Sequence, residues 1–187
     1  MYEVNLEVYT RKGDSGETDT ANGSRIKKFN PIIEWEGTLD ELNSVIGLAR
    51  SHIKFEDIKN DLVQVQFDLF HLGEHVLTRG QGRRLREDGV KWLEERTNFY
   101  FKEVGEIKLF VLPGGSSEAA FLQFARTVTR RAERITVELN ESEKLDKIIL
   151  QYMNRLSSLL FAMALVSNKR QGIKELIFPW PNPENKK

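Results

Sequence analysis

The chain lacks cysteine altogether, which excludes disulfide frameworks, thiolate metal sites and cysteine nucleophiles. Histidine is limited to three of the 187 residues. Neither sign of charge is in excess, because Lys plus Arg and Asp plus Glu both number 28, so no global field attracts nucleic acid or an anionic membrane. Any anion-binding site must therefore be local.

The sequence also lacks the marks of export and of membrane insertion. Its N-terminus has no basic stretch followed by an apolar one, as a signal peptide has, and no apolar run is expected to span a bilayer. We therefore expect a cytoplasmic protein, with no nucleic acid and no membrane among its partners.

What is present suits a single domain over residues 1–187. A chain of this length with 40% hydrophobic residues can bury a core without disulfides or a structural metal. Residues 4–30 are rich in Gly, Thr, Asp and basic residues and show no sustained apolar period. They are expected to form a loop with one short strand at most.

Five helices are predicted from apolar residues at helical spacing. The first begins at a capping box from Thr38 to Glu41, which places Asp40 in its first turn, and runs to about Ser51. The others are expected over about 62–77, 87–101, 116–140 and 143–168, before a tail at 171–187 that contains Pro179, Pro181 and Pro183. Five helices with few strand signals favour an all-α, antiparallel helical bundle.

The segment from Thr10 to Thr18 concentrates two glycines, two cations and several hydroxyl groups. The glycines let backbone amides converge on an anion, which Arg11 and Lys12 would neutralise. The segment is not a P-loop, because no Gly-Lys-Ser/Thr follows a predicted strand. By composition alone, both a phosphate cradle and an ordinary turn rich in Gly, Asp and Ser remain open.

The helix predicted over 116–140 has two distinct faces, given a rotation of about 100° per residue. The side expected to face the core carries Phe121, Phe124, Ala125, Val128, Ala132, Ile135 and Leu139, and the opposite side carries Arg126, Arg130, Glu133 and Arg134. Guanidinium groups one turn apart present forked donors to a polyphosphate, and Glu133 can orient them or a metal-bound water. The alternative is a solvated face on which Glu133 pairs with Arg130.

Polar residues elsewhere leave further alternatives open. Asn154 interrupts an otherwise apolar last helix, so it should bond either to a neighbouring helix or to a ligand. His71 and His75 lie in an H-x-x-E-H pattern, which would suit a helical zinc hydrolase, but Gly73 and the flanking leucines fit a bundle helix and no downstream carboxylate motif supplies a third ligand. We expect packing roles for both. His52 lies at a helix end, where a cation is favourable, and carries no functional prediction.

Five motifs together, in order and spacing over nearly the whole chain, resemble the PduO-type ATP:cobalamin adenosyltransferases. They are Tyr9 to Thr18, Gly37 to Asn43, Phe110 to Gly115, Ala125 to Arg134 and Met153 to Ser157. The resemblance implies a five-helix bundle that forms a homotrimer, with each active site between two subunits. It further implies transfer of the 5′-deoxyadenosyl group of ATP to the Co(I) of a corrinoid, with release of triphosphate and Mg²⁺ as the partner of ATP.

The same resemblance assigns the residues of the site. In the loop region of residues 1–30, those implied to bind the triphosphate are Thr10, Arg11, Lys12, Gly13, Asp14, Gly16, Thr18 and Lys28. Arg130, Arg131, Glu133, Arg134 and Asn154 would complete the nucleotide site. Phe110 corresponds to an aromatic residue beneath the corrin ring that keeps the lower axial position of cobalt free. Asp40 and Arg126 correspond to a pair that bridges two subunits beside the corrinoid.

Three residues depart from the family pattern. The family loop often reads T-G-D-K-G, so Ser15 stands where a second cation is frequent and Lys12 is the nearest replacement; Ser158 and Val166 stand where Asp and Arg are frequent. A trimeric, non-catalytic carrier of ATP or corrinoid is the alternative within the same fold. A corrinoid reductase and an adenosylcobalamin-dependent enzyme are the further partners that the resemblance implies.

Overall fold

The structure is a computed structural model that describes residues 9–20, 23–105 and 110–178. Residues 4–8 of the expected loop and the prolines of the tail lie outside the described residues. The helices are α1 (Pro31–His52), α2 (Glu56–Leu77), α3 (Gly89–Val104), α4 (Ser117–Glu143) and α5 (Lys147–Arg170). Two short strands, β1 (Glu17–Asp19) and β2 (Arg25–Lys27), form an antiparallel hairpin before α1.

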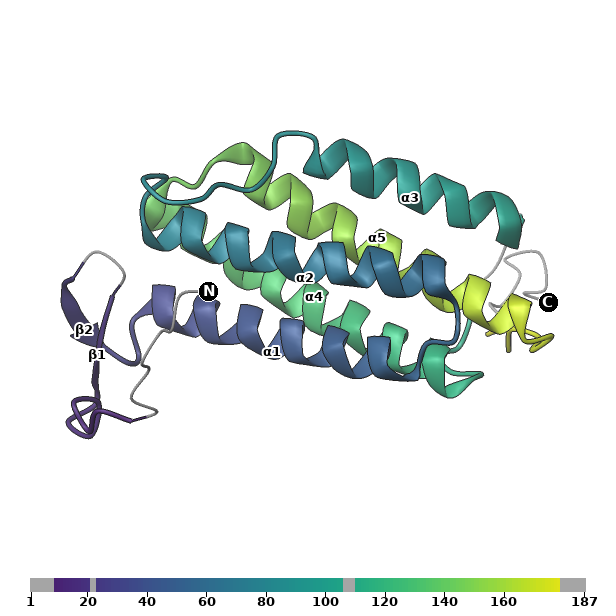
Figure 1. Cartoon of the computed structure of the whole chain (residues 1–187), viewed down its shortest axis with the longest axis horizontal. Coiled ribbons are helices and arrows are strands. Elements are labelled where there is room, and N and C mark those ends of the chain that lie inside the picture. Colours follow the sequence, from purple (N-terminus) through teal and green to yellow (C-terminus); the bar gives the residue numbers. More distant parts are fainter. Residues whose placement is uncertain (1–8, 21–22, 106–109, 179–187) are drawn as a thin grey trace, which may run out of the picture.

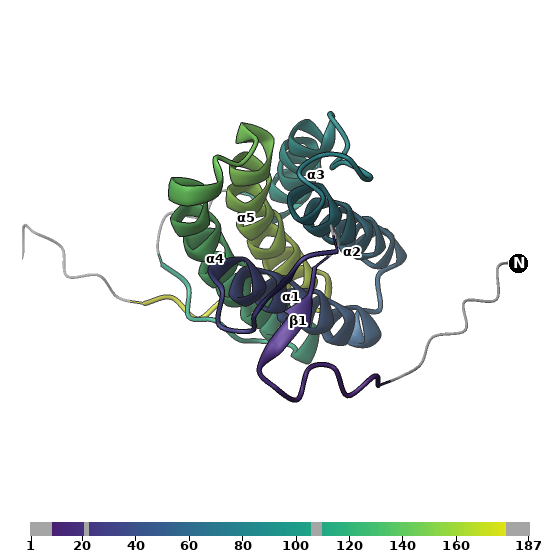
Figure 2. The same cartoon turned by 90° about the vertical axis from the view of Figure 1, so that its left-hand side faces the viewer.

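The five helices form the expected antiparallel bundle (Figures 1 and 2). α4 packs between α1 and α5, while α2 covers α1 and α3 covers α5. The hairpin lies beyond the N-terminal end of α1, and the C-terminal end of α5 lies at the other end of the bundle (Figure 1). At 22 residues, α1 is about 33 Å long. The two ends of the bundle are therefore well separated.

The first helix begins seven residues earlier than the predicted capping box. Asn30 is its N-cap, with a side chain that accepts from the Ile32 amide at 3.1 Å, and Pro31 occupies the first helical position. The Thr38 hydroxyl instead donates to the Glu34 carbonyl within the helix. Asp40 consequently lies near the middle of α1, and its predicted place in the first turn is wrong.

The turn between α4 and α5 also lies later than predicted. α4 continues to Glu143 and ends at Lys144, which has left-handed backbone geometry. The side chain of Asn140 accepts from the Leu145 amide at 2.9 Å and so satisfies the chain just after the helix. α5 therefore begins at Lys147 and not at Glu143.

The core is one cluster along the facing sides of the helices, including buried Trp35, Leu42 and Tyr152. Trp35 links α1 to α4, because its indole donates to the buried Thr136 hydroxyl at 2.8 Å. On α4, Ala125, Val128, Ala132 and Leu139 are buried as expected, whereas Phe124 is exposed because it lies at the edge of the apolar side.

By length and composition, α5 could cross a membrane, with a mean hydropathy of 1.3 over an 18-residue window. This corrects the expectation that no apolar run would be long enough. Within the part of the chain that the structure describes, 61% of that window is buried inside the bundle. A core helix of a bundle has the same composition, because it is apolar on nearly all sides.

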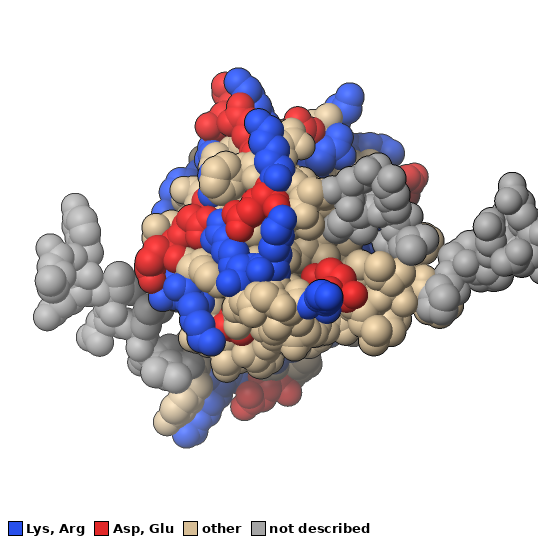
Figure 3. Space-filling model, turned by 90° about the vertical axis from the view of Figure 1, so that its right-hand side faces the viewer, with Lys and Arg blue, Asp and Glu red and all other residues tan. Residues whose placement is uncertain are grey.

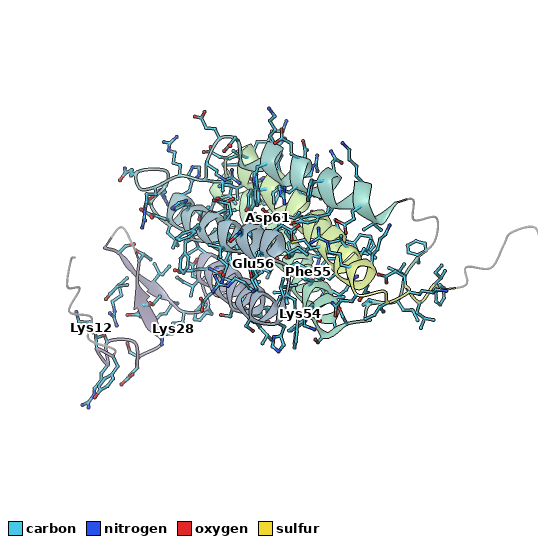
Figure 4. All side chains as sticks on the ribbon, turned by 45° about the vertical axis from the view of Figure 1, so that its right-hand side comes forward. Lys12, Lys28, Lys54, Phe55, Glu56 and Asp61 are labelled. Carbon is cyan, nitrogen blue, oxygen red and sulfur yellow. The ribbon has the colours of Figure 1, made fainter. Side chains whose placement is uncertain are left out.

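Aspartates on α2 bind guanidinium groups from α3, from the segment just before α3 and from the end of α5. Asp57 binds Arg170 through two hydrogen bonds of 2.8 and 2.9 Å, Asp61 binds Arg96 at 2.6 Å, and the fully buried Asp68 binds Arg86 at 3.1 Å. The hydrogen bonds from Arg170 hold the pKa of Asp57 below its ordinary value. Figure 4 shows Asp61 on α2 beneath α3.

Candidate functional site

The N-terminal loop is a chain of tight turns next to the β hairpin. The amide of Asp14 donates to the Arg11 carbonyl, and the amide of Gly16 donates to the Gly13 carbonyl. Arg11 and Gly16 both have positive φ, of 59° and 82°. Successive turns with left-handed residues bring backbone amides together, which is the geometry of an anion-binding nest.

Two cations, Lys12 and Lys28, lie beside Gly13. Lys28 extends toward the turn at Gly13, where a Cβ atom would lie 3.0 Å from the lysine ammonium nitrogen. Figure 4 shows Lys12 in the loop before the hairpin and Lys28 at the other side of the hairpin, where the chain leads into α1. The absence of a side chain at Gly13 therefore lets Lys28 approach the predicted phosphate cradle.

Arg25 holds the loop in shape. Its guanidinium bonds to Glu17 at 3.2 Å, to Asp19 at 3.0 Å and to the Lys12 carbonyl. Glu17 also accepts from Lys27, and these two cations hold its pKa below the ordinary value, Lys27 having the larger effect. The acids of β1 are thus neutralised by strand cations, and Lys12 and Lys28 have no ion-pair partner among the described residues.

The arginines predicted on the polar side of α4 differ in whether their guanidinium groups have partners. Arg131 pairs with Glu41 of α1, and Arg134 donates to the Arg130 carbonyl one turn earlier at 3.0 Å. The exposed guanidinium of Arg130 has no hydrogen bond or ion pair within the described chain. Arg130 is therefore available to an external anion.

Glu133 and Asn154 contact each other between α4 and α5. The Asn154 amide donates to the Glu133 carboxylate at 2.7 Å, so the alternative in which Glu133 pairs with Arg130 is not what the structure shows. Asn154 is exposed and bonds to a neighbouring helix, which is one of its two predicted options. The pair borders the arginines and fixes the direction of the Glu133 carboxylate.

Arg126 is half-buried without a carboxylate partner among the described residues. Its Nε donates to the Gln123 side-chain oxygen at 2.8 Å, and its guanidinium lies 5.8 Å from the centre of the Phe161 ring. Burial, with a smaller effect from the charge of Arg130, lowers the pKa of Arg126. A half-buried cation that lacks a counter-ion is costly for the isolated chain.

The opposite situation occurs on α1. Asp40 is exposed, and neither it nor Glu36 has an ion-pair partner in the described part of the chain. Burial and then the charge of Asp40 raise the pKa of Glu36. The chain thus carries unpaired acids on α1 and an unpaired cation on α4, and nothing within the described chain brings them together.

Asp40 and Glu36 line a groove between α1 and α2 with a volume of about 660 Å³. Its apolar wall includes two exposed rings, Phe67 at 57% and Phe70 at 68%. Sequence reasoning did not identify these two residues. The available signal was a pair of phenylalanines three positions apart, on a different side of α2 from its buried leucines.

Phe110 lies at the other end of the bundle, on a short antiparallel pairing between residues 110–112 and 176–178. Val111 faces Ile177, the Leu112 amide donates to the Leu176 carbonyl, and the Phe178 amide donates to the Phe110 carbonyl, both at 2.7 Å. This confirms the predicted extended stretch. The ring of Phe110 is 67% exposed.

The structure brings the α4 residues together but keeps the other predicted parts of the site apart. Among the described residues, no hydrogen bond or ion pair joins the N-terminal loop to α4. The loop precedes α1, whereas Phe110 lies seven residues before α4, and the contact of Lys54 with Glu118 places the start of α4 at the far end of α1. The length of α1 therefore separates the N-terminal loop, with its predicted phosphate cradle, from Phe110.

The histidines do not form a metal site in the described chain, where no group of three potential ligands gathers. His75 is buried, and its Nε2 lies 2.9 Å from the Asp146 carboxylate at the start of α5. His52 ends α1, bonds through Nδ1 to the Leu48 carbonyl at 3.0 Å and lies against the Phe121 ring. His75 thus contacts the start of α5, and His52 contacts its own helix and Phe121 of α4.

Comparison with known proteins gives a consistent set of relatives. Residues 8–167 match the family model described as cobalamin adenosyltransferase. The corrinoid adenosyltransferase of Bacillus subtilis (strain 168) is 42% identical over 177 residues, which cover 91% of each chain. The cobalamin adenosyltransferase of Cupriavidus metallidurans is 39% identical over 173 residues, covering 92% of this chain and 94% of that protein.

Solved structures agree with these sequence relatives. A phenylalanine-to-histidine variant of the PduO-type ATP:corrinoid adenosyltransferase from Lactobacillus reuteri, complexed with cobalamin and ATP, superposes with a TM-score of 0.86. It is 33% identical, over 92% of this chain and 96% of that one. An arginine-to-lysine variant of that enzyme, complexed with ATP, has a TM-score of 0.85 and 34% identity, over 92% of this chain and all of that one.

Proposed function

The chain belongs to the cobalamin adenosyltransferase family, and on that premise we propose that its active site is assembled between neighbouring copies of the chain. The reaction is the family's: the 5′-deoxyadenosyl group of ATP is transferred to the reduced cobalt of a corrinoid, and triphosphate is released. The homologous structures that hold both cobalamin and ATP support catalysis over a carrier role.

The observation that carries the assembly is the charge left unpaired on two different faces. One face, here called the Arg126 face, comprises Arg126, Arg130 and Phe161, and Phe110 lies at its end. The other, the Asp40 face, comprises Asp40 and the groove rings Phe67 and Phe70. A contact between unlike faces is heterologous, and such contacts form a ring when the rotation between neighbouring copies closes. A ring of three, the homotrimer that the family resemblance implies, would pair every Asp40 with an Arg126.

The ring arrangement would also bring together the parts of the predicted site that are far apart within one chain. Within one chain, α1 keeps the N-terminal loop and Phe110 apart, yet the nucleotide and the corrinoid must meet at the bond that forms. In a ring, the loop and the Asp40 face of one copy adjoin the Arg126 face and Phe110 of the next. The corrin ring would then lie in the groove beside Asp40, against Phe67 and Phe70.

The proposed residues act mainly by position and charge. The cobalt(I) of the substrate donates an electron pair to the 5′-carbon, and the bond between that carbon and the triphosphate oxygen breaks, with its electron pair leaving on triphosphate. No proton moves in this step, so no general base is needed. Lys12, Lys28 and Arg130 would stabilise the charge that develops on the leaving group.

Mg²⁺ fits this site as a partner of the triphosphate. Protein sites hold Mg²⁺ through one or two carboxylates together with substrate phosphates, and Asp14 and Glu133 are the carboxylates beside the proposed triphosphate site. When bound, the ion would neutralise part of the triphosphate charge. Glu133 is directed by Asn154 and so is fixed before substrate binds.

Phe110 would act on the second substrate. An aromatic ring beneath the corrin would exclude the lower axial ligand, which makes the cobalt easier to reduce to the nucleophilic state. This role rests on the family motif and on the exposure of the ring at the end of the Arg126 face. A cytoplasmic location, and partnership with a reductase and an adenosylcobalamin-dependent enzyme, belong to the same proposal.

The test mixes the protein with ATP, Mg²⁺ and chemically reduced cobalamin, and follows adenosylcobalamin and triphosphate while native mass spectrometry measures the assembly. We expect product in equal amounts and a trimeric mass. Binding of both ligands without product would favour the carrier. A catalytically active monomer would contradict the shared site while leaving the reaction intact.

A further inference from the structure

Asn168 makes three hydrogen bonds to residues outside its own helix. It lies in the last turn of α5 and is 2% exposed. Its Oδ1 accepts from the Ser116 amide at 2.8 Å, and its Nδ2 donates to the Gly114 carbonyl and to the Glu175 carboxylate, each at 3.0 Å. Both polar atoms of the side-chain amide therefore have hydrogen-bond partners, and these partners fix its orientation.

These partners lie at the end of the pairing between residues 110–112 and 176–178, where the first strand ends and the second begins. Gly114 and Ser116 belong to the turn that follows Phe110 and leads into α4. Glu175 immediately precedes residues 176–178, which pair with residues 110–112. One buried amide thus connects the turn after Phe110 to the strand that runs beside it.

Gly115 shows how closely this amide approaches the turn. A Cβ atom at Gly115 would lie 2.3 Å from both polar atoms of the Asn168 amide, and the backbone there has a φ of +100°. A side chain at Gly115 would therefore displace Asn168 and strain the backbone as well. The contact therefore requires glycine at position 115, which leaves room for the amide, and the side-chain amide of Asn168.

The next two residues of α5 hold the other flank of the same segment. Lys169 donates to the carbonyls of Glu103 and Val104 at the end of α3, and Arg170 binds the Glu103 carboxylate. Figure 3 looks onto this end of the bundle and shows acidic and basic side chains next to one another across it. One turn of α5 therefore contacts both the end of α3 and the turn that follows Phe110.

We propose that Asn168 is a positioning residue for Phe110, which sets the height and direction of the ring through the turn at Gly114 and the strand at 176–178. The inference rests on the proposed role of Phe110 beneath the corrin. The ring is two-thirds exposed, so the backbone on either side has a large share in placing it. Asn168 holds the turn after Phe110 and, through Glu175, the start of the strand paired with it, and none of its hydrogen bonds within the described chain involves a proposed substrate-binding group.

The test compares Asn168→Ala with Ser167→Ala. Ser167 is the matched control, because it is equally buried but donates only to the Met163 carbonyl of its own helix. Four-coordinate Co(II) is measured by electron paramagnetic resonance with ATP bound, and ATP affinity and turnover of chemically supplied Co(I) are measured alongside. We expect Asn168→Ala to lower the four-coordinate fraction on the order of tenfold, since losing buried hydrogen bonds shifts an equilibrium by about that factor.

ATP affinity should be unchanged, turnover of Co(I) should fall much less, and Ser167→Ala should behave as the parent protein. A merely structural role for Asn168 would instead lower thermal stability and all three readouts together, and that result would overturn the proposal. If Asn168→Ala does not fold, Glu175→Ala carries the test, because it removes one of the three hydrogen bonds from a less buried residue. A four-coordinate fraction that Glu175→Ala leaves unchanged would then refute the positioning role.

A rescue experiment sharpens the result. Asn168→Asp keeps the acceptor for the Ser116 amide but faces the Glu175 carboxylate with a like charge, so the four-coordinate fraction should fall. Adding Glu175→Gln to Asn168→Asp restores a donor and should recover part of it. Phe110→Ala distinguishes the role of Phe110 from that of Asn168. If Phe110→Ala keeps the four-coordinate Co(II) signal, the proposed role of Phe110 itself is wrong. If Phe110→Ala loses the signal while the Asn168 variants keep it, only the positioning role is wrong.

Discussion

Arg126 and Arg130 lie one turn apart on α4, but their surroundings differ and suit different roles. Arg126 is half-buried beside Phe161, with a pKa lowered by burial and by its neighbour, and it needs a fixed counter-charge. Arg130 is exposed, and its guanidinium has no bond within the described chain. An exposed guanidinium can adapt to a bound polyphosphate, whereas a half-buried one suits a permanent pair.

We predict that Arg130→Ala slows adenosyl transfer by on the order of 10²-fold, by analogy with the removal of one preorganised donor to a developing anion. The loss should appear chiefly in kcat, because the charge on triphosphate develops as the bond breaks. The control is Arg79→Ala, an arginine that is 79% exposed at the turn after α2. Unchanged kinetics with ATP in Arg130→Ala would remove Arg130 from the site.

For the histidines we predict a structural role only. His75 is held by Asp146 at the junction of α2 with α5, so changing His71 and His75 together to Gln should cost about 1 kcal/mol of stability for the lost hydrogen bond. Turnover per folded protein should stay the same, and zinc analysis should find no stoichiometric metal in either protein. Loss of activity with an intact fold would revive the zinc-hydrolase alternative.

At the scale of single residues, sequence reasoning was strongest where chemistry alone decides. The polar face of α4 with its arginines and the extended stretch at Phe110 follow from residue type and helical spacing, whereas the same reasoning does not decide whether Asn154 bonds to a neighbouring helix or to a ligand. The pairing of Glu133 with Asn154 rather than Arg130 depends on how α4 and α5 pack. The exposed rings Phe67 and Phe70 were missed because an apolar residue is assigned to the core by default.

At the scale of whole elements, the helices at the C-terminal half were predicted to within a few residues. The start of α1 was not, although Asn30 and Pro31 are a standard N-terminal signal. The glycine at position 37 and the polar residues beside it broke the apolar period. In the structure Trp35 is buried against α4, and this tertiary contact sustains the first turns of the helix.

The ion pairs of Arg170 should make the end of the bundle sensitive to acid. Arg170 holds the pKa values of Asp57 and Glu103 below their ordinary values of 3.8 and 4.5. A lowered acid pKa contributes stability that is present above the ordinary value and is lost as pH falls through the folded one. Because all three groups are partly exposed, we expect Arg170→Met to cost about 1 to 3 kcal/mol at pH 7.

The same difference should begin to shrink as pH falls through the ordinary values of 3.8 and 4.5, and should approach zero only below the lowered pKa values of the folded parent, where its carboxylates are protonated as well. Urea unfolding of both proteins at pH 7 and at pH 4 and below measures it. Lys59→Met is the control, because its pair with Glu56 is an exposed contact within α2 and should contribute less than about 0.5 kcal/mol. A cost for Arg170→Met that does not depend on pH would rule out the ion pairs as its source.

For the whole molecule, the bundle itself was predictable, because five apolar periods and short connections have few other solutions. Helical spacing alone could not predict the proposed active site, since its residues lie at opposite ends of the bundle and on unlike faces; only the family resemblance implied a site between subunits. Helical spacing places residues on a face of their own helix but says nothing about which face a second copy covers. Here the unpaired charges of Asp40 and Arg126 supply that information.

The pair also provides the sharpest test of the ring. If Asp40 of one copy meets Arg126 of the next in a buried contact, removing either partner leaves the other charge unpaired, at a cost on the order of 3 to 5 kcal/mol. Asp40→Ala and Arg126→Ala should each shift the trimer toward monomers in native mass spectrometry and raise the KM for the corrinoid. The exposed Lys91→Ala, whose pair with Glu95 stays within α3, should change neither.

The double variant then decides between a direct pair and two independent effects. If the two side chains touch, Asp40→Ala with Arg126→Ala should cost much less than the sum of the single changes, and the exchange Asp40→Arg with Arg126→Asp should restore part of the trimer. Arg126 forms no ion pair with a carboxylate in the described part of its own chain. A large coupling energy between Asp40 and Arg126 must therefore come from a contact between copies. Strictly additive effects on trimer stability would show that the charges do not meet, and the ring would then need a different contact between unlike faces.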